Sequence, residues 1–337
     1  MSNSIVKNAS DFLFLYEAIQ CNPNGDPDQE NKPRMDYDTK TNLVTDTRVK
    51  RFIRDYLMDV NEDELVFVNM EDNQKVSVDS KLKAVVKRTM DNEGELEKAF
   101  KGEPEKLEVY KEILHKSKDL EEVWKSITDK KFKHKDLNYI LLDYLVKQKY
   151  IDVRMFGSAF AVGGFTKAYT GPIQMNWGYS LNKVELMESS SIVTIMNDDN
   201  STFGKDYRLH YSLLGFNGTI NQHAAKVTGL TEEDVNQFSE ALWKAIPANP
   251  TRSKLNQYPK LYVKVTYKEG ESNGNLGDLR NYVSVKPKAG ISEKQIRKFS
   301  DLELDTGKLK SVLEANKDII EKVEVKTAPD VSFSVNL

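Results

Sequence analysis

The chain has 337 residues, of which 39% are hydrophobic and 30% are charged, and its formal net charge is -3 at pH 7. This composition supports a sizeable core in two domains, or in one domain with insertions, and no apolar run approaches the roughly 20 residues of a membrane span. Because the N-terminus also lacks the apolar segment of a signal peptide, we expect a cytoplasmic protein without a membrane partner.

A strand is predicted over residues 12–20, where Phe, Leu, Tyr and Ile dominate, and its apolar density favours a central place in a sheet. The loop that follows, residues 21–36, reads CNPNGDPDQENKPRMD. Its Asn, Gly and Pro residues are turn formers, so an ordinary tight turn explains the pattern. Alternatively, Gly25 and the neighbouring amides form a concavity in which an anionic backbone settles.

Two carboxylates, Asp26 and Asp28, lie in this loop. A carboxylate above a bound RNA can assist in-line cleavage or hold a metal ion, whereas a carboxylate beside a helix N-terminus often only caps. The single cysteine, Cys21, excludes an internal disulfide, and the four histidines show no zinc-ligand or catalytic spacing. We therefore expect no metal, no cofactor and no catalytic residue, and cleavage by Asp26 is the alternative.

An amphipathic helix is predicted over residues 45–57, with Thr45 or Asp46 as its N-cap. At about 100° per residue, its polar side collects the side chains Thr47, Lys50, Arg51 and Arg54. A solvated surface helix is one explanation of this basic side, and contact with phosphate groups is the other. Arg48, on the other flank, fits either explanation.

From residue 61 to residue 150 the composition shifts to Lys and Glu with helical stretches, which indicates an inserted helical subdomain. A strand is predicted over DVRMFGSAF, so that Arg154 and Phe156 share one face, as base stacking and phosphate contact require. Such a pair is also common in ordinary cores. The following GGFTKAY places Lys167 and Tyr169 after a flexible glycine pair, consistent with a groove that follows a nucleic-acid backbone.

Residues 187–210 form a polar, turn-rich excursion between two strand patterns. A disordered loop and an arm that uses Phe203 and Lys205 to reach a neighbour or a nucleic acid both explain it. The predicted order along the rest of the chain is a strand pair around 173–177 and 211–221, a helix capped by Thr231, and a strand over 260–267. Helices over 292–300 and 307–322 and strand-like runs over 322–328 and 331–335 complete the pattern.

Without the insertions, the element order is strand, helix, strand, strand, helix, strand, which is typical of an α+β, ferredoxin-like domain and of RNA-recognition modules. The chain lacks the aromatic string of an RNA-recognition motif, and its net acidity gives no support to nucleic-acid binding. It does not exclude such binding, because a basic groove can coexist with an acidic remainder.

Six strings in one order carry a more specific signal: NPNGDP, NKPRMD, VTDTRVKRFIRDYL, DVRMFG, TGPIQMNWGYSLNKVE and FGKDYRLHYSLLGFNG. In combination they resemble the repeating backbone subunit of type I CRISPR surveillance (Cascade) complexes, the seventh CRISPR-associated protein family. The subtype I-B branch is the most similar, and subtype I-C shares much of the pattern. The resemblance covers residues 12 to about 290.

The resemblance implies a hand-shaped fold. Residues 1–60, 151–186 and 211–290 match a palm of the RNA-recognition type, residues 61–150 a helical finger insertion, and residues 187–210 a thumb hairpin. Residues 291–337 then complete the palm with helices and short strands. Copies of such a subunit polymerise along one CRISPR RNA, hold its phosphate backbone and leave its bases to pair with target DNA.

The implied partners are the CRISPR RNA, target DNA, further copies of the chain and other Cascade subunits: the large subunit, the repeat-handle-binding subunit and the RNA-processing subunit. The residues that match the RNA-contacting motifs are Asn22, Asn24, Gly25, Thr47, Lys50, Arg51, Arg54, Arg154, Phe156, Gly157 and Lys167. Phe203 and Lys205 match the thumb.

Type I relatives are not nucleases, whereas type III relatives cut RNA with an aspartate in the loop after the first strand. Asp26 stands within GDP, a type I pattern, which favours a turn or capping role.

Overall fold

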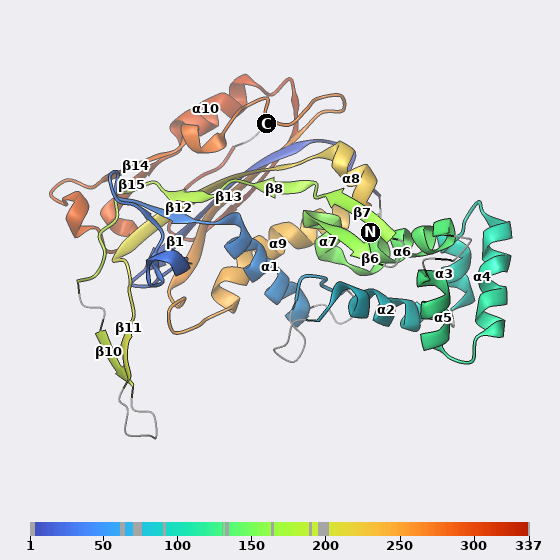
Figure 1. Cartoon of the computed structure of the whole chain (residues 1–337). Helices are drawn as coiled ribbons and strands as arrows, with labels where there is room; N and C mark the ends of the chain where they lie inside the picture. The colour runs from blue at the N-terminus through green and yellow to red at the C-terminus, as the bar shows by residue number, and fades with distance from the viewer. Residues whose placement is uncertain are drawn as a thin grey trace. The chain divides into compact units, whose positions relative to one another are not determined.

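The computed structural model describes residues 4–60, 65–69, 76–89, 92–129, 131, 135–162, 165–188, 191–194 and 202–335 (Figure 1). The chain divides into two compact units. Unit 1 contains Met1–Ile5, Leu57–Pro172 and His223–Val235, and unit 2 contains Val6–Tyr56, Ile173–Gln222 and Asn236–Leu337. Among the described residues, no helix combines the length and the apolarity that crossing a membrane requires.

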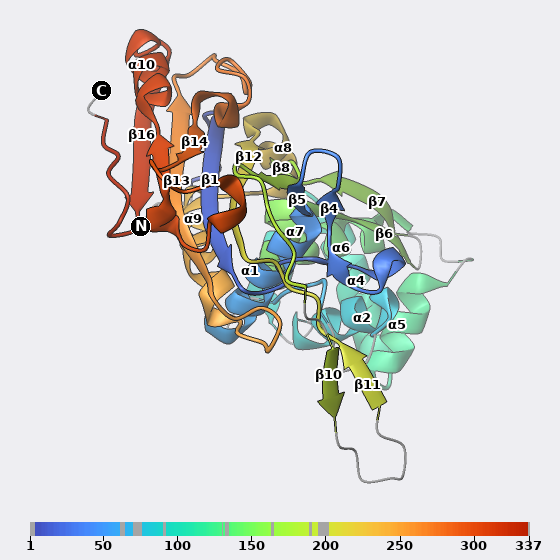
Figure 2. The same cartoon turned by 90° about the vertical axis from the view of Figure 1, so that its left-hand side faces the viewer.

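Unit 2 is built on an antiparallel sheet of 8 strands, and Figure 2 shows β16, β13, β1 and β12 side by side. The order continues from β12 to β9, β5 and β4, with β8 also paired to β12. The strands are β1 (Ser10–Ile19), β4 (Met35–Asp36), β5 (Thr41–Val44), β8 (Ile173–Met175), β9 (Gly178–Ser180), β12 (Tyr211–Ile220), β13 (Gln257–Tyr267) and β16 (Ile320–Thr327).

Strand β1 is the centre of this sheet, as its apolar density predicts. Side chains alternate across a strand, so Phe12, Phe14 and Tyr16 lie on one face while Leu13 and Leu15 lie on the other, and all are fully buried. Both faces are therefore covered, which explains why FLFLY has no polar alternation.

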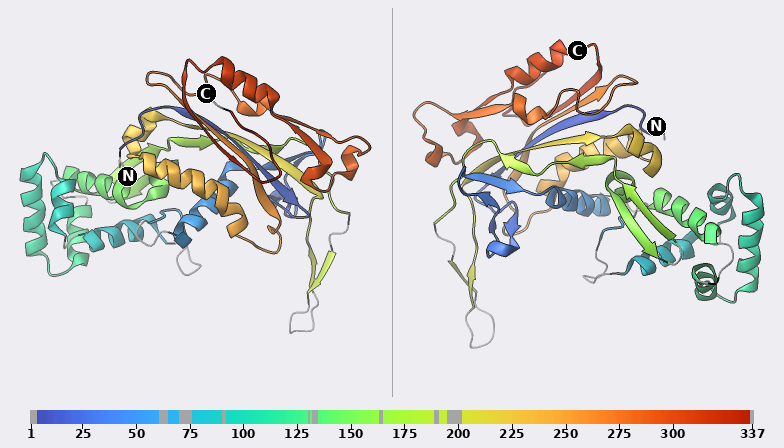
Figure 3. Two further views of the ribbon diagram at one scale, coloured as in Figure 1. Left: turned by 180° about the vertical axis from the view of Figure 1, so that it is seen from behind. Right: turned by 45° about the horizontal axis from the view of Figure 1, so that its top comes forward.

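Helices cover the two faces of the sheet, as both views of Figure 3 show for α9 (Glu232–Ala248) and α10 (Gly307–Ala315). On the face of α9, the ring of Phe238 lies 5.4 Å from the ring of Phe12 in an edge contact. On the other face, Leu309 of α10 belongs to the same buried cluster as Leu13 and Leu15. The aromatic face of β1 thus carries α9, and the leucine face carries the C-terminal elements.

The helix starts agree with the sequence prediction. Helix α1 (Asp46–Val60) follows Thr45, whose Oγ1 accepts a hydrogen bond from the Arg48 amide at 3.2 Å. Thr231 and Asp234 cap α9 reciprocally, since each side chain accepts from the other's amide, at 3.1 and 2.9 Å. At both helix N-termini, these side chains accept hydrogen bonds from backbone amides that the helix itself leaves unpaired.

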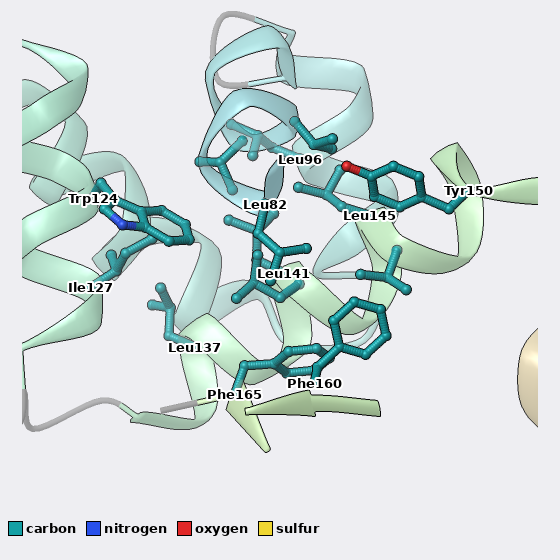
Figure 4. Close-up of a cluster of buried hydrophobic side chains, with 14 of the residues drawn as sticks. Leu82, Leu96, Trp124, Ile127, Leu137, Leu141, Leu145, Tyr150, Phe160 and Phe165 are labelled. Carbon is teal, nitrogen blue, oxygen red and sulfur yellow. The ribbon is translucent and has the colours of Figure 1, made fainter. Parts of the chain in front are cut away.

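Unit 1 is mainly helical. Its elements are α2 (Val78–Thr89), α3 (Glu93–Ala99), α4 (Pro104–Lys116), α5 (Leu120–Thr128), α6 (Lys135–Lys149), α7 (Ile151–Phe156), the hairpin of β6 (Gly157–Val162) and β7 (Phe165–Thr170), and most of α8 (Gln222–Thr228). Figure 4 shows its core, where Leu141 and Leu145 of α6 meet Leu82, Trp124 and Phe160. Helical stretches predicted within the insertion, over 105–127 and 136–150, are confirmed by α4, α5 and α6.

Several strand and helix predictions are wrong. Residues 151–156 form helix α7, and the strand begins only at Gly157. Trp177 lies between β8 and β9 and is 49% exposed, although its alternation predicts a strand. Residues 331–335 pair with no strand in the described chain, so their alternating pattern remains without secondary structure.

The segment 292–300 contains only the short 3-10 turns Glu293–Gln295 and Phe299–Asp301 in place of the predicted helix. Farther along, α10 ends at Ala315, and β16 begins at Ile320 within the stretch predicted to be helical.

Candidate nucleic-acid interface

The loop 21–36 is braced by its own asparagines. The Asn24 Oδ1 atom accepts hydrogen bonds from the amide and the hydroxyl of Thr45, at 2.9 and 3.0 Å, which ties the loop to the start of α1. The Asn22 side chain is buried and donates to the carbonyl of Asn31 at 2.7 Å. A Cβ at Gly25 would lie 3.0 Å from the same carbonyl oxygen, so the loop packs closely there. These side chains therefore position the loop against α1 within unit 2.

Asp26 has a structural role in this loop. Its carboxylate caps the 3-10 turn Pro27–Gln29 by accepting from the Asp28 amide at 3.2 Å, and it forms an ion pair with Arg34 at 3.3 Å. The predicted capping role is confirmed. Among the described residues, no three His, Cys, Asp or Glu side chains gather closely enough to hold a metal ion.

The basic side of α1 is more paired than its pattern predicts. Lys50 is only 8% exposed, and its Nζ lies 2.9 Å from the Asp46 carboxylate, one helical turn away. Arg51 remains more accessible and forms a two-point contact with Asp55, at 2.9 and 2.8 Å. Thr47 is exposed and Arg54 is half-buried. Of the two explanations offered for the basic side, a solvated surface does not describe Lys50, because its ammonium folds back along the helix to Asp46.

Arg154 and Phe156 do not share a strand face, because both lie on helix α7 in unit 1 and are buried, at 7% and 8% exposure. The Arg154 guanidinium donates to the carboxylate of Asp234 at 2.9 and 2.8 Å. It also donates to the carbonyls of Lys147 and Gln148, at 3.1 and 3.2 Å. Arg154 thus closes a buried polar network.

Gly157 and Lys167 also have defined structural surroundings in unit 1. Gly157 ends α7 with a φ of 75°, and a Cβ there would meet the Tyr169 carbonyl oxygen at 2.2 Å, so only glycine fits. The Lys167 Nζ lies 2.5 Å from the Asp143 carboxylate and 5.1 Å from the centre of the Tyr139 ring. Lys167 is therefore paired, and Tyr139 beside it is 37% exposed.

The predicted thumb contains an antiparallel hairpin in unit 2, formed by β10 (Ser191–Thr194) and β11 (Thr202–Lys205), and Figure 2 shows it projecting away from the sheet. Phe203 lies in β11, but its side chain falls outside the described part of the structure. Lys205 is exposed and pairs with Glu30 at 3.0 Å, and this hydrogen bond is the main reason that the pKa of Glu30 is lowered. The base of the hairpin is thus tied to the loop 21–36.

Two cations near the end of β1, Arg208 and Lys254, escape sequence-based prediction of the site, and a third, Arg48, is left open by it. Arg208 donates to the Gln20 carbonyl at 3.1 Å and holds Asp206, and Lys254 donates to the Asn22 carbonyl. Arg48 stacks over the Phe52 ring, 4.0 Å from its centre. The helical pattern of α1 includes Arg48. Lys254 lies in a turn more than 200 positions away from Asn22, and no sequence pattern around it predicts their contact.

Comparison with known proteins identifies relatives over nearly the whole chain. The protein-family model described as "CRISPR-associated protein Cas7" matches residues 8–307. A curated "CRISPR-associated protein Cas7" from Haloferax volcanii is 29% identical over 341 residues, which cover 94% of this chain and 86% of the relative.

One solved structure shows the same fold. A chain of a "CRISPR RNA-guided surveillance complex, pre-nicking" has a TM-score of 0.53 at 13% identity, with 96% of this chain and 94% of that chain covered. A second chain, of a "CRISPR RNA-guided surveillance complex", has a TM-score of 0.44 at 13% identity, with 96% and 93% covered.

Proposed function

The chain belongs to the CRISPR-associated protein Cas7 family, and on that premise we propose that it is an RNA-binding backbone subunit of a type I surveillance complex, of subtype I-B. The observation that carries the proposal is the family match over residues 8–307, which includes the braced loop, the basic helix α1 and the thumb hairpin. In this function, copies of the chain polymerise along one CRISPR RNA and hold its phosphates. The RNA bases then remain free to pair with target DNA.

The palm of this subunit is a ferredoxin-like domain made from residues 1–60, 151–186 and 211–290, completed by residues 291–337. The strand order supports this assignment. Four strands of the sheet lie side by side in the order β13, β1, β12, β9. Counted along the chain, these are the fourth, first, third and second of the four. Helix α1 follows the first of these strands and α9 follows the third, as in a split β-α-β domain. Residues 61–150 form the finger and residues 187–210 the thumb.

The RNA site of the palm comprises the loop of Asn22, Asn24 and Gly25 and the polar side of α1, with Thr47, Lys50, Arg51 and Arg54. Recognition is by charge and shape, because phosphate contacts carry no base information. Sequence is then read by base pairing, as in other RNA-guided systems. In unit 1, four further residues match RNA-contacting motifs of the family: Arg154, Phe156, Gly157 and Lys167. The contacts of Arg154 favour a supporting role for it.

The proposed subunit is not an enzyme. The Asp26 carboxylate contacts Arg34 and the Asp28 amide, both within the loop 21–36. These two contacts support a structural role for it. The remaining proposed partners are the large subunit, the repeat-handle-binding subunit and the RNA-processing subunit of a Cascade complex, together with target DNA.

Co-expression tests the proposal directly. The chain is produced with its neighbouring genes and a repeat array, and the assembled material is purified, extracted and analysed for bound RNA. We expect RNA of uniform length, particles that contain several copies of the chain, and binding of complementary DNA. Assembled particles without nucleic acid would contradict the proposal and indicate a protein scaffold.

A further inference from the structure

Arg48 and Lys254 form a pair of cations without a carboxylate partner in the described part of the chain. Arg48 is half-buried on the first turn of α1, and its Nε has no hydrogen-bond acceptor there. Lys254, also half-buried, lies in the turn after α9 and donates to a neutral acceptor, the Asn22 carbonyl. We call these two residues the Arg48–Lys254 pair.

A chain of hydrogen bonds connects the two members of the pair within unit 2. Lys254 contacts Asn22, and two positions later Asn24 accepts from Thr45. Thr45 in turn accepts from the Arg48 amide at 3.2 Å. The braced loop 22–24 therefore holds the turn of Lys254 beside the start of α1. The two positive charges are close enough for Arg48 to be the second cause, after burial, that lowers the pKa of Lys254 to about 8.

The nearby carboxylates are committed to other cations. Asp206 contacts Arg208 at 2.7 Å and Arg252 at 3.2 Å, and Asp55 contacts Arg51 at 2.8 Å. The Cys21 thiol supplies no charge either, because burial raises its pKa to about 12. Asp206 and Asp55 therefore favour the charges of Lys254 and Arg48 only from a distance, and neither carboxylate forms an ion pair with them in the described part of the chain.

Such an arrangement is costly without a ligand. Partial removal of a cation from water is unfavourable unless an anion or several acceptors replace the water, and two adjacent like charges repel each other. Perturbed, unpaired charges of this kind gather preferentially at functional sites. A guanidinium beside an ammonium suits the oxygens of a phosphate group, since Arg offers parallel donors and Lys a compact charge.

We propose that Arg48 and Lys254 together bind one phosphodiester group of single-stranded RNA, at the end of strand β1 and beside the braced loop. This inference rests on the proposed RNA-binding function and adds two contacts to those proposed for Lys50, Arg51 and Arg54. Arg252, whose side chain is 60% exposed, extends the positive surface past Lys254. Several cations on α1 and on this turn favour a polyanion over a single small anion, although Lys50 and Arg51 also pair with Asp46 and Asp55.

Charge-neutralising variants test the pair. The purified full chain is titrated with labelled single-stranded RNA of its own repeat sequence at several salt concentrations. We expect Arg48→Gln and Lys254→Gln each to weaken binding about tenfold, as the loss of one charged hydrogen-bonded contact does. The slope of log affinity against log salt should flatten by about 0.7 for the lost phosphate contact. The matched control is Lys310→Gln, on α10, which removes one exposed positive charge and should bind as the wild type does.

The conservative variant separates charge from folding. Lys254→Arg keeps a permanent charge, so we expect it to retain RNA affinity. The wild type should lose affinity between pH 7 and pH 9 as Lys254 is deprotonated, and Lys254→Arg should not. The charged or titratable groups around Lys254 are Arg48, Arg208, Asp206 and Cys21, and its own pKa is the one lowered to about 8.

The two hypotheses fail differently. If the wild type binds RNA but Arg48→Gln and Lys254→Gln bind with unchanged affinity and salt slope, the pair is not a phosphate site. If either glutamine variant does not fold, equal pH dependence of the wild type and Lys254→Arg overturns the inference. Competition of RNA binding by millimolar inorganic phosphate alone would indicate a small-anion site instead. A wild-type chain that retains no RNA overturns the proposed function together with the pair.

Discussion

Arg154 and Asp234 form a buried, two-point ion pair in unit 1, with N–O distances of 2.9 and 2.8 Å. The side chains are 9% and 3% exposed, so neither charge is shared with solvent. The same carboxylate accepts from the Thr231 amide at the start of α9. One contact therefore fixes α7, the helix start at Thr231 and, through the carbonyls of Lys147 and Gln148, the end of α6.

We predict that Arg154→Ala lowers the free energy of unfolding by about 3–5 kcal/mol, because it leaves the Asp234 charge buried without a partner. Urea unfolding followed by circular dichroism measures the loss. The double variant Arg154→Met, Asp234→Leu should recover much of it, since no uncompensated charge remains. Normal stability of Arg154→Ala with reduced RNA binding would instead make Arg154 a direct RNA contact.

Gly157→Ala should be destabilising for two reasons. The φ of 75° disfavours a side chain, and the new Cβ would lie 2.2 Å from the Tyr169 carbonyl oxygen. The matched control is Gly102→Ala, which has a φ of 90° in the same unit but nothing within 4 Å of the added atom. We expect the control to lose about 1 kcal/mol from backbone strain alone and Gly157→Ala to lose distinctly more. Equal midpoints in urea for the two variants would exclude a steric role of Gly157.

Arg51, a partly exposed cation of α1, permits a test of the palm site. Arg51→Gln should weaken binding several-fold and equally for RNAs of different sequence, with a salt slope that flattens by about 0.7. Its effect on stability should stay below about 0.5 kcal/mol, because a partly exposed pair on one helix contributes little. Asp55→Asn is the informative partner variant. It frees Arg51 from its carboxylate and should keep or strengthen RNA binding, and a loss of affinity would argue against phosphate contact by Arg51.

Asp26 should be dispensable for any reaction. We expect assembled complexes incubated with complementary RNA and Mg²⁺ to leave that RNA intact, with the wild type and with Asp26→Ala alike. The variant should cost about 1 kcal/mol of stability, because the cap on the Asp28 amide and the pair with Arg34 are lost. Regularly spaced cuts that disappear in Asp26→Ala would identify the chain as a ribonuclease subunit.

Sequence pattern was sufficient where an element is defined by its own side chains. Strand β1 has apolar residues on both faces, and α9 repeats its apolar positions with a helical period and begins with a capping box. The pattern failed for α7 because all of its residues from Ile151 to Phe156 are buried. A segment without an exposed side has no polar period to reveal whether it is a helix or a strand. The strand prediction for residues 331–335 was wrong for a different reason. An alternating segment becomes a strand only where a neighbouring strand pairs with it.

The candidate site divides in the same way. The loop of Asn22 and Asn24 and the basic side of α1 are local features, and neighbouring residues in the sequence predict them. The pairing of Lys50 with Asp46, the burial of Arg154 against Asp234 and the approach of Lys254 to Asn22 are products of packing. Lys254 lies 232 positions from Asn22, and no local pattern reports such a contact. Residue order thus specifies helix faces, caps and turns through neighbouring side chains. Which charges remain free to meet a ligand depends on distant segments, because burial and counter-charge arise only when they pack together.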